Sequence, residues 1–412
     1  MAGWTVKVGF DATTSTIGNT FVLDDPVRGQ LDNPDYVLGG LLFVDVTQYL
    51  KSLTISRGKS RELDRYNAGQ ATVVFDNRTR AFDPTFEASP YYGNIVPRRE
   101  IKLLYNDVEQ FRGFIDDWNL NYDLNGNSTA EASCSDAFSF LANQTLDGGV
   151  QTSQLSGARI NAVLNDPSVN WSASRRQIMS GQMLLGADTI APDTIALNYL
   201  QLIETTEPGA LFIGKNGDVV FKDRSDGPAS SGALLLSDTP GGGAVVYRTV
   251  SVNYGSELLY NQVVVSRVGG GTAVADDTGS QSEYGIQTLT YTDLLMASDA
   301  DVDNLALYLG SLYASPEFRF DAVNLDLRSL STTQANQIMA LELKDNVRVS
   351  FTPNGIAPAI ERYGEVIRID IAHDVSSLTT DVSLGFTTVS VSPIVLDDLV
   401  FGKLDSGNVL GF

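Results

Sequence analysis

The stretch from Ser56 to Pro84 reads SRGKSRELDRYNAGQATVVFDNRTRAFDP and is the most informative part of this chain for its fold. A strand-like run, Leu53–Ser56, leads into Arg57-Gly58 and a basic turn. A second alternating run, Ala71–Phe75, then leads into an Asp, Asn and Pro-containing segment. Short apolar runs of period two between turn residues predict neighbouring β-strands.

The same stretch begins a local reversal of charge. The whole chain has 412 residues and a net charge of −22. From Arg57 to Lys102 there are nine Lys or Arg and six Asp or Glu, so this segment is +3 and the remainder −25. A basic segment in an acidic protein predicts a docking surface for another acidic surface, such as a second copy. The predicted subunit-interface residues are Arg57, Arg61, Arg65, Arg78, Arg80, Arg98 and Arg99.

Composition restricts the classes of protein that fit. The length predicts two to four domains, and the abundance of Val, Thr, Ile, Tyr and Phe in short alternating runs predicts a mostly β protein. A single cysteine, Cys134, excludes a disulfide framework and a cysteine-rich zinc site. We expect no signal peptide and no membrane-spanning helix, because the start and the apolar runs lack the required patterns. The pI near 4.3 speaks against nucleic-acid binding, because an acidic surface repels DNA and would let it slide past without binding.

The fold class expected from these patterns is mainly β with a small α+β insertion. Two antiparallel β-barrel or sandwich domains are flanked by short β-type terminal arms. The expected divisions are an N-terminal arm (1–45), a first β domain (46–148), a small α+β domain (149–232), a second β domain with one helix (233–390) and a C-terminal arm (391–412).

Local signals place several elements. Apolar residues at helical spacing predict helices over 136–143, 156–165, 194–206 and 299–314. Asn216-Gly217 between two apolar runs predicts a hairpin, and Leu124–Asn127 predicts another. Ser298 and Asp301 fit the N-terminal cap of the last helix.

The two ends of the chain share a short module. Val22–Asp32 (VLDDPVRGQLD) aligns with Val395–Asp405 (VLDDLVFGKLD), and with the flanking VLG there are about ten identities in seventeen positions. Two interpretations stay open: the copies pack on their own neighbouring domains, or they dock on other subunits through strand edges. The residues predicted as docking arms are Leu23, Asp24, Asp25, Leu31, Asp32, Leu396, Asp397, Asp398, Leu404 and Asp405.

No set of residues predicts catalysis, a metal site or a cofactor. The only histidine, His373, follows a strand, and no Gly-x-Ser-x-Gly sequence supplies a nucleophile for it. Cys134 lies in an alternating run and is most simply a core residue. The acidic run at 299–304 lacks the glycine and the distal glutamate of a calcium loop. We therefore expect a protein that is not an enzyme and holds no cofactor.

The segment Leu53–Pro84 resembles the N-terminal domain of minor tail and baseplate hub proteins of long-tailed bacteriophages. In that family a strand ending in Arg-Gly precedes a basic turn, and a second strand leads into Asp-Asn-x-x-x-x-Phe-Asp-Pro, here Asp76–Pro84. Pro97–Lys102 and Phe111–Asp116 are similar to the next strands. Leu200–Arg224 and Tyr260–Leu384 are more loosely similar to later parts of phage hub proteins.

This resemblance implies a structural component of the virion at the tail tip, assembled in the cytoplasm of the bacterial host. It implies a homotrimeric hub ring that closes the tail tube, anchors fibres or a spike for host attachment, and contacts tube and distal tail proteins. Two β-barrel-like domains per chain would then match a sixfold tube. The alternatives are a hexameric distal tail ring that binds carbohydrate, and a tail-associated hydrolase that degrades the cell envelope.

Overall fold

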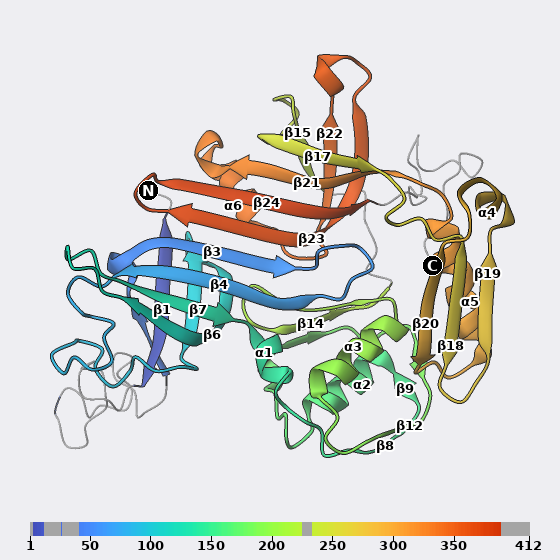
Figure 1. Cartoon of the computed structure of the whole chain (residues 1–412), viewed down its shortest axis with the longest axis horizontal. Coiled ribbons are helices and arrows are strands. Elements are labelled where there is room, and N and C mark those ends of the chain that lie inside the picture. Colours follow the sequence, from blue (N-terminus) through green and yellow to red (C-terminus); the bar gives the residue numbers. More distant parts are fainter. Residues whose placement is uncertain (1–2, 12–25, 27–40, 225–232, 389–412) are drawn as a thin grey trace.

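A computed structural model describes residues 3–11, 26, 41–224 and 233–388. Strands hold 44% of the residues and helices 19%, which confirms the mainly β prediction. One sheet of fourteen strands dominates the molecule (Figure 1). Its strands are β1 (Trp4–Asp11), β2 (Leu41–Asp45), β3 (Leu50–Gly58), β4 (Asn67–Asp76), β5 (Glu100–Tyr105), β6 (Val108–Asn121), β7 (Thr129–Ser135), β15 (Leu234–Ser237), β16 (Val245–Val246), β17 (Thr249–Tyr254), β21 (Phe318–Asp326), β22 (Asn346–Phe351), β23 (Ile360–Asp374) and β24 (Thr379–Thr388).

The two predicted β domains are joined by strand pairing. β3 of the first domain pairs antiparallel with β23 of the second, with Ser56 opposite Asp370. Figure 1 shows these two strands side by side at the centre of the molecule. The sheet therefore runs without a break from β6 through β7, β4, β3, β23, β24 and β21 to β17. No closed barrel forms among the strands that the structure describes.

The second domain repeats the strand arrangement of the first. β3, β4, β5, β6 and β7 pair as β17, β21, β22, β23 and β24 do, in the same order along the chain. Each repeat has one long strand, β6 or β23, whose first part pairs with the preceding strand and whose second part pairs with the following one. The register of both long strands shifts at one extra residue, Asp116 in β6 and Ile367 in β23.

Local backbone details repeat as well. Arg98 and Lys344 each donate a main-chain hydrogen bond to the long strand, at Ile115 O (2.6 Å) and Val366 O (2.7 Å). Both have a left-handed backbone, with φ of 66° and 71°. Such matched detail in two segments means that residues of one repeat can be aligned with those of the other.

The Asp-Asn…Phe-Asp-Pro segment forms a compact turn between β4 and β5 of the first repeat. The Asn77 side chain accepts a hydrogen bond from Phe82 N at 3.0 Å, and the Phe82 ring stacks on Phe75 with centroids 4.5 Å apart. Asp83 accepts hydrogen bonds from the Thr85 main chain and side chain, which lower the pKa of its carboxyl. The motif behind the resemblance is therefore a packing motif, in which buried polar groups fix an aromatic cluster.

The predicted α+β insertion is present. Its helices are α2 (Ser156–Leu164) and α3 (Ala196–Thr206), and the predicted Asn-Gly hairpin joins β13 (Ala210–Ile213) to β14 (Val219–Lys222). α1 (Ala137–Leu141) precedes the insertion, near the end of the predicted first β domain, and contacts both β4 and α3. β14 also pairs with β10 (Arg176–Ile178), and two small ribbons complete the unit. These ribbons are made by β8 (Gly149–Gln151) with β12 (Asp188–Ile190) and by β9 (Gln154–Leu155) with β11 (Leu184–Leu185).

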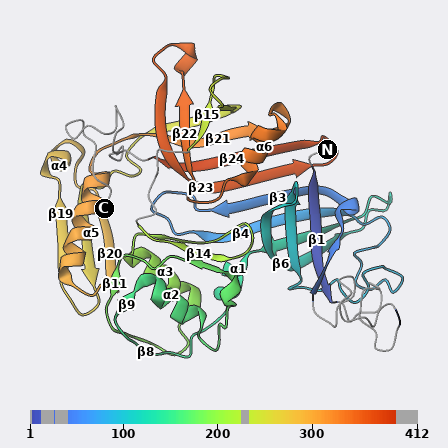
Figure 2. The same cartoon turned by 180° about the vertical axis from the view of Figure 1, so that it is seen from behind.

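The prediction of one helix in the second β domain is wrong, because the described part of that domain has three. They are α4 (Thr278–Tyr284), the predicted α5 (Asp299–Tyr313) and α6 (Thr332–Ala340). α5 packs on the strands β18 (Gln262–Arg267) and β19 (Thr272–Asp276), and β18 also pairs with β20 (Thr288–Leu294). This three-stranded unit is inserted between β17 and β21, and it stands at the end opposite β1 and β6 in both views (Figures 1 and 2).

Part of the predicted N-terminal arm belongs to the main sheet. β1 pairs with β5 and with β2, so residues 4–11 and 41–45 extend the first β domain. All ten residues predicted as docking arms lie outside the described residues.

Glu204 of α3 is buried where the α+β unit meets the first repeat. One carboxyl oxygen accepts a hydrogen bond from Leu211 N at 3.0 Å. Burial raises the pKa of Glu204 from 4.5 to about 7, and the nearby Lys59 and Arg65 only partly oppose this. Between these two values the folded chain holds a proton that the unfolded chain has released. The contribution of this group to stability therefore falls as the pH rises from about 4.5 to 7.

We expect Glu204→Gln to remove this pH dependence, because the amide does not titrate. The stability of the variant relative to wild type should rise between pH 5 and pH 7 and level off above pH 8. Urea unfolding at each pH measures the difference, with Glu87→Gln as the control at an exposed carboxylate. Parallel pH curves for wild type and Glu204→Gln would contradict the prediction.

Candidate functional site

One face of the central sheet is polar across eight strands. Side chains alternate along each strand, so on β3 Leu53 and Ile55 point into the core while Thr54 and Ser56 are exposed. The strand registers place the exposed residues in rows that cross both repeats. One row contains Asp117, Ser133, Thr72, Thr54, Ala372, Asp381 and Asp326. The next contains Ser135, Gln70, Ser56, Asp370, Ser383, Asn324 and Thr249.

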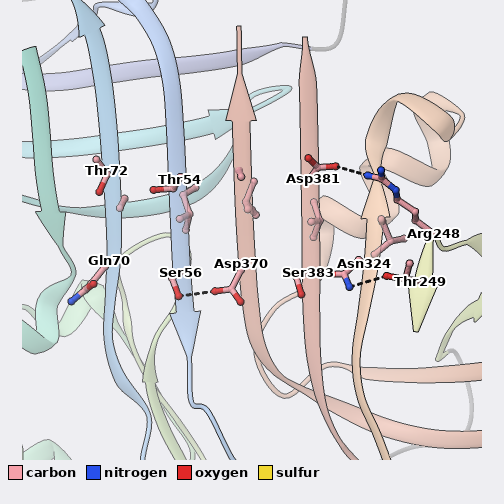
Figure 3. Close-up of a pocket in the computed structure, with 16 residues that line it drawn as sticks. Thr54, Ser56, Gln70, Thr72, Arg248, Thr249, Asn324, Asp370, Asp381 and Ser383 are labelled. Atoms are coloured by element: carbon pink, nitrogen blue, oxygen red, sulfur yellow. Dashed lines mark hydrogen bonds and ion pairs between the residues drawn. The ribbon is translucent and has the colours of Figure 1, made fainter. Parts of the chain in front are cut away.

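Figure 3 shows much of this face, which is hollowed to a volume of about 710 Å³. Ser56 donates a hydrogen bond to Asp370 at 2.6 Å across the junction of the two repeats. Asn324 donates to the Thr249 hydroxyl at 3.0 Å. The side chains are therefore held by one another and present a hydrated surface of hydroxyl, amide and carboxylate groups.

The charge of this face is negative. The residues named in the two rows include four carboxylates and neither lysine nor arginine, and Ala372 is the only apolar one among them. Phe114 of β6, which is partly buried, continues the second row opposite Ser135. Arg248 approaches Asp381 at 3.7 Å from the margin, and Arg368 pairs with Asp370 at 3.0 Å. A surface of this kind repels polyanions and offers few apolar contacts to a molecule that moves along it.

The predicted basic interface residues differ in burial and in their partners. Arg57 is buried and bonds Glu342 (2.6 Å), whereas Arg65 is exposed. Most of the others have carboxylate partners within the chain: Arg61 with Glu257, Arg78 with Asp76, Arg80 with Asp83, and Arg98 with Asp116, while Arg99 bonds the Asn94 side chain. The side chains of Arg61, Arg78, Arg80 and Arg98 are about half or more exposed, so they are also accessible from outside.

The residues considered for chemistry have structural surroundings. His373 packs against Trp4, and its Nδ1 lies 2.8 Å from Thr379 O and 2.9 Å from the Thr380 hydroxyl. Burial lowers the pKa of His373 and raises that of Cys134, which lies in the core. Within the described ranges no group of three potential metal ligands occurs. No helix there is long and apolar enough to cross a membrane.

The polar face is not predicted by the alternation of single strands, although the sequence contains a signal for it. Ser52–Gly58 (SLTISRG) and Thr249–Gly255 (TVSVNYG) have the same alternation and the same final glycine, and they are equivalent strands of the two repeats. A search for internal repeats at the level of pattern would have paired them.

No protein-family model matches the sequence, and no curated protein sequence matches it. Among solved structures, the tail protein from Neisseria meningitidis MC58 is similar, with a TM-score of 0.59, 10% identity, and coverage of 94% of this chain and 97% of that chain. The 43 kDa tail protein of prophage MuSo2 from Shewanella oneidensis is also similar, with a TM-score of 0.53 and 14% identity over 83% of this chain and 94% of that one. The expected resemblance is confirmed at the level of structure: this chain has the fold of phage tail proteins.

Proposed function

We propose that this chain is a structural, non-enzymatic component of a phage tail tip, in which three copies form a hub ring at the distal end of the tail tube. The observation that carries the proposal is the eight-stranded polar sheet, built from two equivalent four-stranded parts. Three copies supply six such parts, so the ring has threefold chemical symmetry and approximate sixfold symmetry at the sheet. The fold of the two similar tail proteins supports the same role.

Sheet dimensions favour three copies over two. Strands lie about 4.8 Å apart, so 24 strands close into a cylinder about 37 Å across between backbones, and wider when the strands tilt. Sixteen strands from two copies give only about 24 Å before side chains are added. The larger cylinder leaves room for a DNA duplex about 20 Å across, whereas the smaller one is too narrow for a duplex once its side chains are added.

The polar face lines the lumen in this proposal. Its row of carboxylates faces the passing DNA and repels the phosphates, so that DNA moves through without binding. The opposite face of the sheet carries apolar residues such as Ile55 and Ile371, which need the core of the protein and cannot face water.

The proposal also includes contacts with other tail proteins and between subunits of the ring. The ring meets tube and distal tail proteins and holds fibres or a spike for host attachment. The exposed arginines of the basic segment, among them Arg61 and Arg78, contribute to contacts between subunits. The related modules near both ends of the chain serve as docking arms.

Particle mass and symmetry test this function. We expect the purified chain to form a trimer as its concentration rises, measured by light scattering, and threefold rings in electron micrographs of the protein or of tails. Arg61→Glu with Arg78→Glu should weaken the trimer and leave the circular dichroism of the chain unchanged. A chain that stays monomeric at all concentrations would refute the ring, and a ring of six copies would favour the alternative distal tail protein.

A further inference from the structure

The polar sheet has two free edges within the described ranges. At one end, β17 pairs only with β21. At the other end, residues 117–121 of β6 pair only with β7, because β5 reaches no further than Phe114. The eight strands are all antiparallel, so the two outermost strands run in opposite directions. A copy placed head to tail with another therefore brings β17 and β6 together as an antiparallel pair.

The chain already contains a junction of this kind. In the alignment of the repeats, β17 is equivalent to β3 and β6 is equivalent to β23, and β3 pairs with β23 inside the chain. The internal junction is therefore a template for the pairing of two copies. Its register places Thr54 opposite Ala372 and Ile55 opposite Ile371.

The equivalent positions follow from the neighbouring registers. Just past the extra residue of each long strand, Ser133 of β7 and Gly385 of β24 are counterparts, and they lie opposite Thr72 and Ala322. Thr54 lies opposite Thr72 as Ser251 lies opposite Ala322, which makes Ser251 the counterpart of Thr54. The extra residues Asp116 and Ile367 align the long strands. Counting from them, Asn121 is the counterpart of Ala372, Leu120 of Ile371 and Trp118 of Ile369.

Side chains at the free edges are more exposed than their counterparts at the internal junction, as expected for strands that lack a partner. Ile55 is 2% exposed at the internal junction, and its counterpart Val252 is 40% exposed at the free edge. Arg57 is 5% exposed, and its counterpart Tyr254 is 68% exposed. Tyr122, the counterpart of His373, is 51% exposed on the other edge. Apolar or aromatic side chains thus lie exposed at both edges, whereas Ile55 and Arg57 at the internal junction are buried.

One contact shows that the two edges complement each other. At the internal junction Arg57 bonds Glu342, which lies two residues before Lys344. Because Arg98 is the counterpart of Lys344, the counterpart of Glu342 is Val96, which is 39% exposed. An ion pair within the chain is thus replaced by an apolar pair, Tyr254 with Val96, at the free edges. Both residues of the pair are charged at the internal junction and apolar at the free edges, as expected for the two sides of one interface.

The geometry points to a second copy of this chain as the partner of β17, with β6 of that copy added antiparallel in the register of the internal junction. Ser251 then lies opposite Asn121, and Val252 lies opposite Leu120. Asn253 faces Asn119 on the polar side, and Tyr254 packs near Trp118 and Val96 on the apolar side. The inference rests on the proposed ring and names the strands that close it.

Cysteine pairs test the register. In the full chain, Ser251→Cys with Asn121→Cys should form a disulfide between copies on mild oxidation, giving dimers and trimers on a non-reducing gel, because directly opposite residues lie within disulfide range. The pair Thr54→Cys with Ala372→Cys is the matched control, since it occupies the equivalent places inside one chain. Ser251→Cys with Asn119→Cys is displaced by two residues and should cross-link at least tenfold less. Native Cys134 is buried and does not compete.

The outcomes separate the register from the ring. Equal cross-linking of the displaced pair, or no cross-linking in an assembly whose mass is that of a trimer, would overturn this strand pairing and leave the hub ring standing. A chain that stays monomeric at high concentration would refute both. Cross-linked trimers from the in-register pair alone establish the pairing.

Discussion

Arg57→Ala is expected to lower the free energy of unfolding by about 3–5 kcal/mol, because it leaves a partner charge uncompensated in a largely buried site. The Arg57 side chain is 4% exposed, and its Nη2 donates to Glu342 at 2.6 Å and to Ile213 O at 2.8 Å. Glu342 also accepts from Lys215 N at 2.8 Å. The guanidinium therefore joins the first repeat, the α+β unit and the second repeat.

The control for this prediction is Arg78→Ala in the same basic segment. The Arg78 side chain is 63% exposed and pairs with Asp76 beside it, so its removal should cost no more than about 1 kcal/mol. Urea unfolding of the two variants at a dilution where the chain is monomeric gives the comparison. Similar losses in both would contradict the role of Arg57 as the link between the three units.

Glu207→Ala is expected to destabilise the α+β unit by about 4 kcal/mol, because it leaves three donors, two of them buried, without an acceptor. Glu207 is fully buried. One carboxyl oxygen accepts from the Ser156 hydroxyl and from Met183 N, both at 2.7 Å, and the other accepts from Gln182 N at 2.9 Å. Glu207 directly follows the last residue of α3. Its carboxylate links the start of α2 to the loop that precedes β11.

Glu207→Gln separates the hydrogen bonds from the packing. The amide keeps the shape and one acceptor oxygen, so its loss of stability should lie between wild type and Glu207→Ala. Glu87→Ala, at an exposed position, should change stability by less than about 0.5 kcal/mol. Proteolysis of the native protein gives a second measurement, because opening of this unit exposes the chain around α2. Equal stability of Glu207→Ala and wild type would show that the loop is held by other contacts.

Local patterns predicted the elements whose signals lie within a few residues. The Asn216-Gly217 turn between apolar runs gave its hairpin, and Ser298 caps α5 by accepting from Asp301 N as expected. α4 and α6 were missed because their sequences, TGSQSEY and TTQANQIMA, have few apolar residues at helical spacing. The capping box of Ser331 and Gln334 was the available signal for α6.

The candidate site is formed by strand pairings that no local sequence pattern predicts. Ser56 and Asp370 are 314 residues apart, and each reads in the sequence only as a polar residue of an alternating strand. Likewise, the basic segment looked like one surface, but its arginines point to separate carboxylates, and Arg57 lies in the core. Charge along a sequence does not specify which partner each side chain meets.

The β class, the α+β insertion and the likeness to tail proteins follow from the sequence alone, because alternation, turn residues and motif spacing act over short distances. The pairing of β3 with β23, which joins two equivalent repeats into one sheet, is visible only in the folded chain, since core packing between distant segments determines the strand partners. The same pairing created the polar face and left β17 and β6 as matching edges. The stretch from Ser56 to Pro84 contains the end of β3 at that central junction, the whole of β4, and the turn that follows β4.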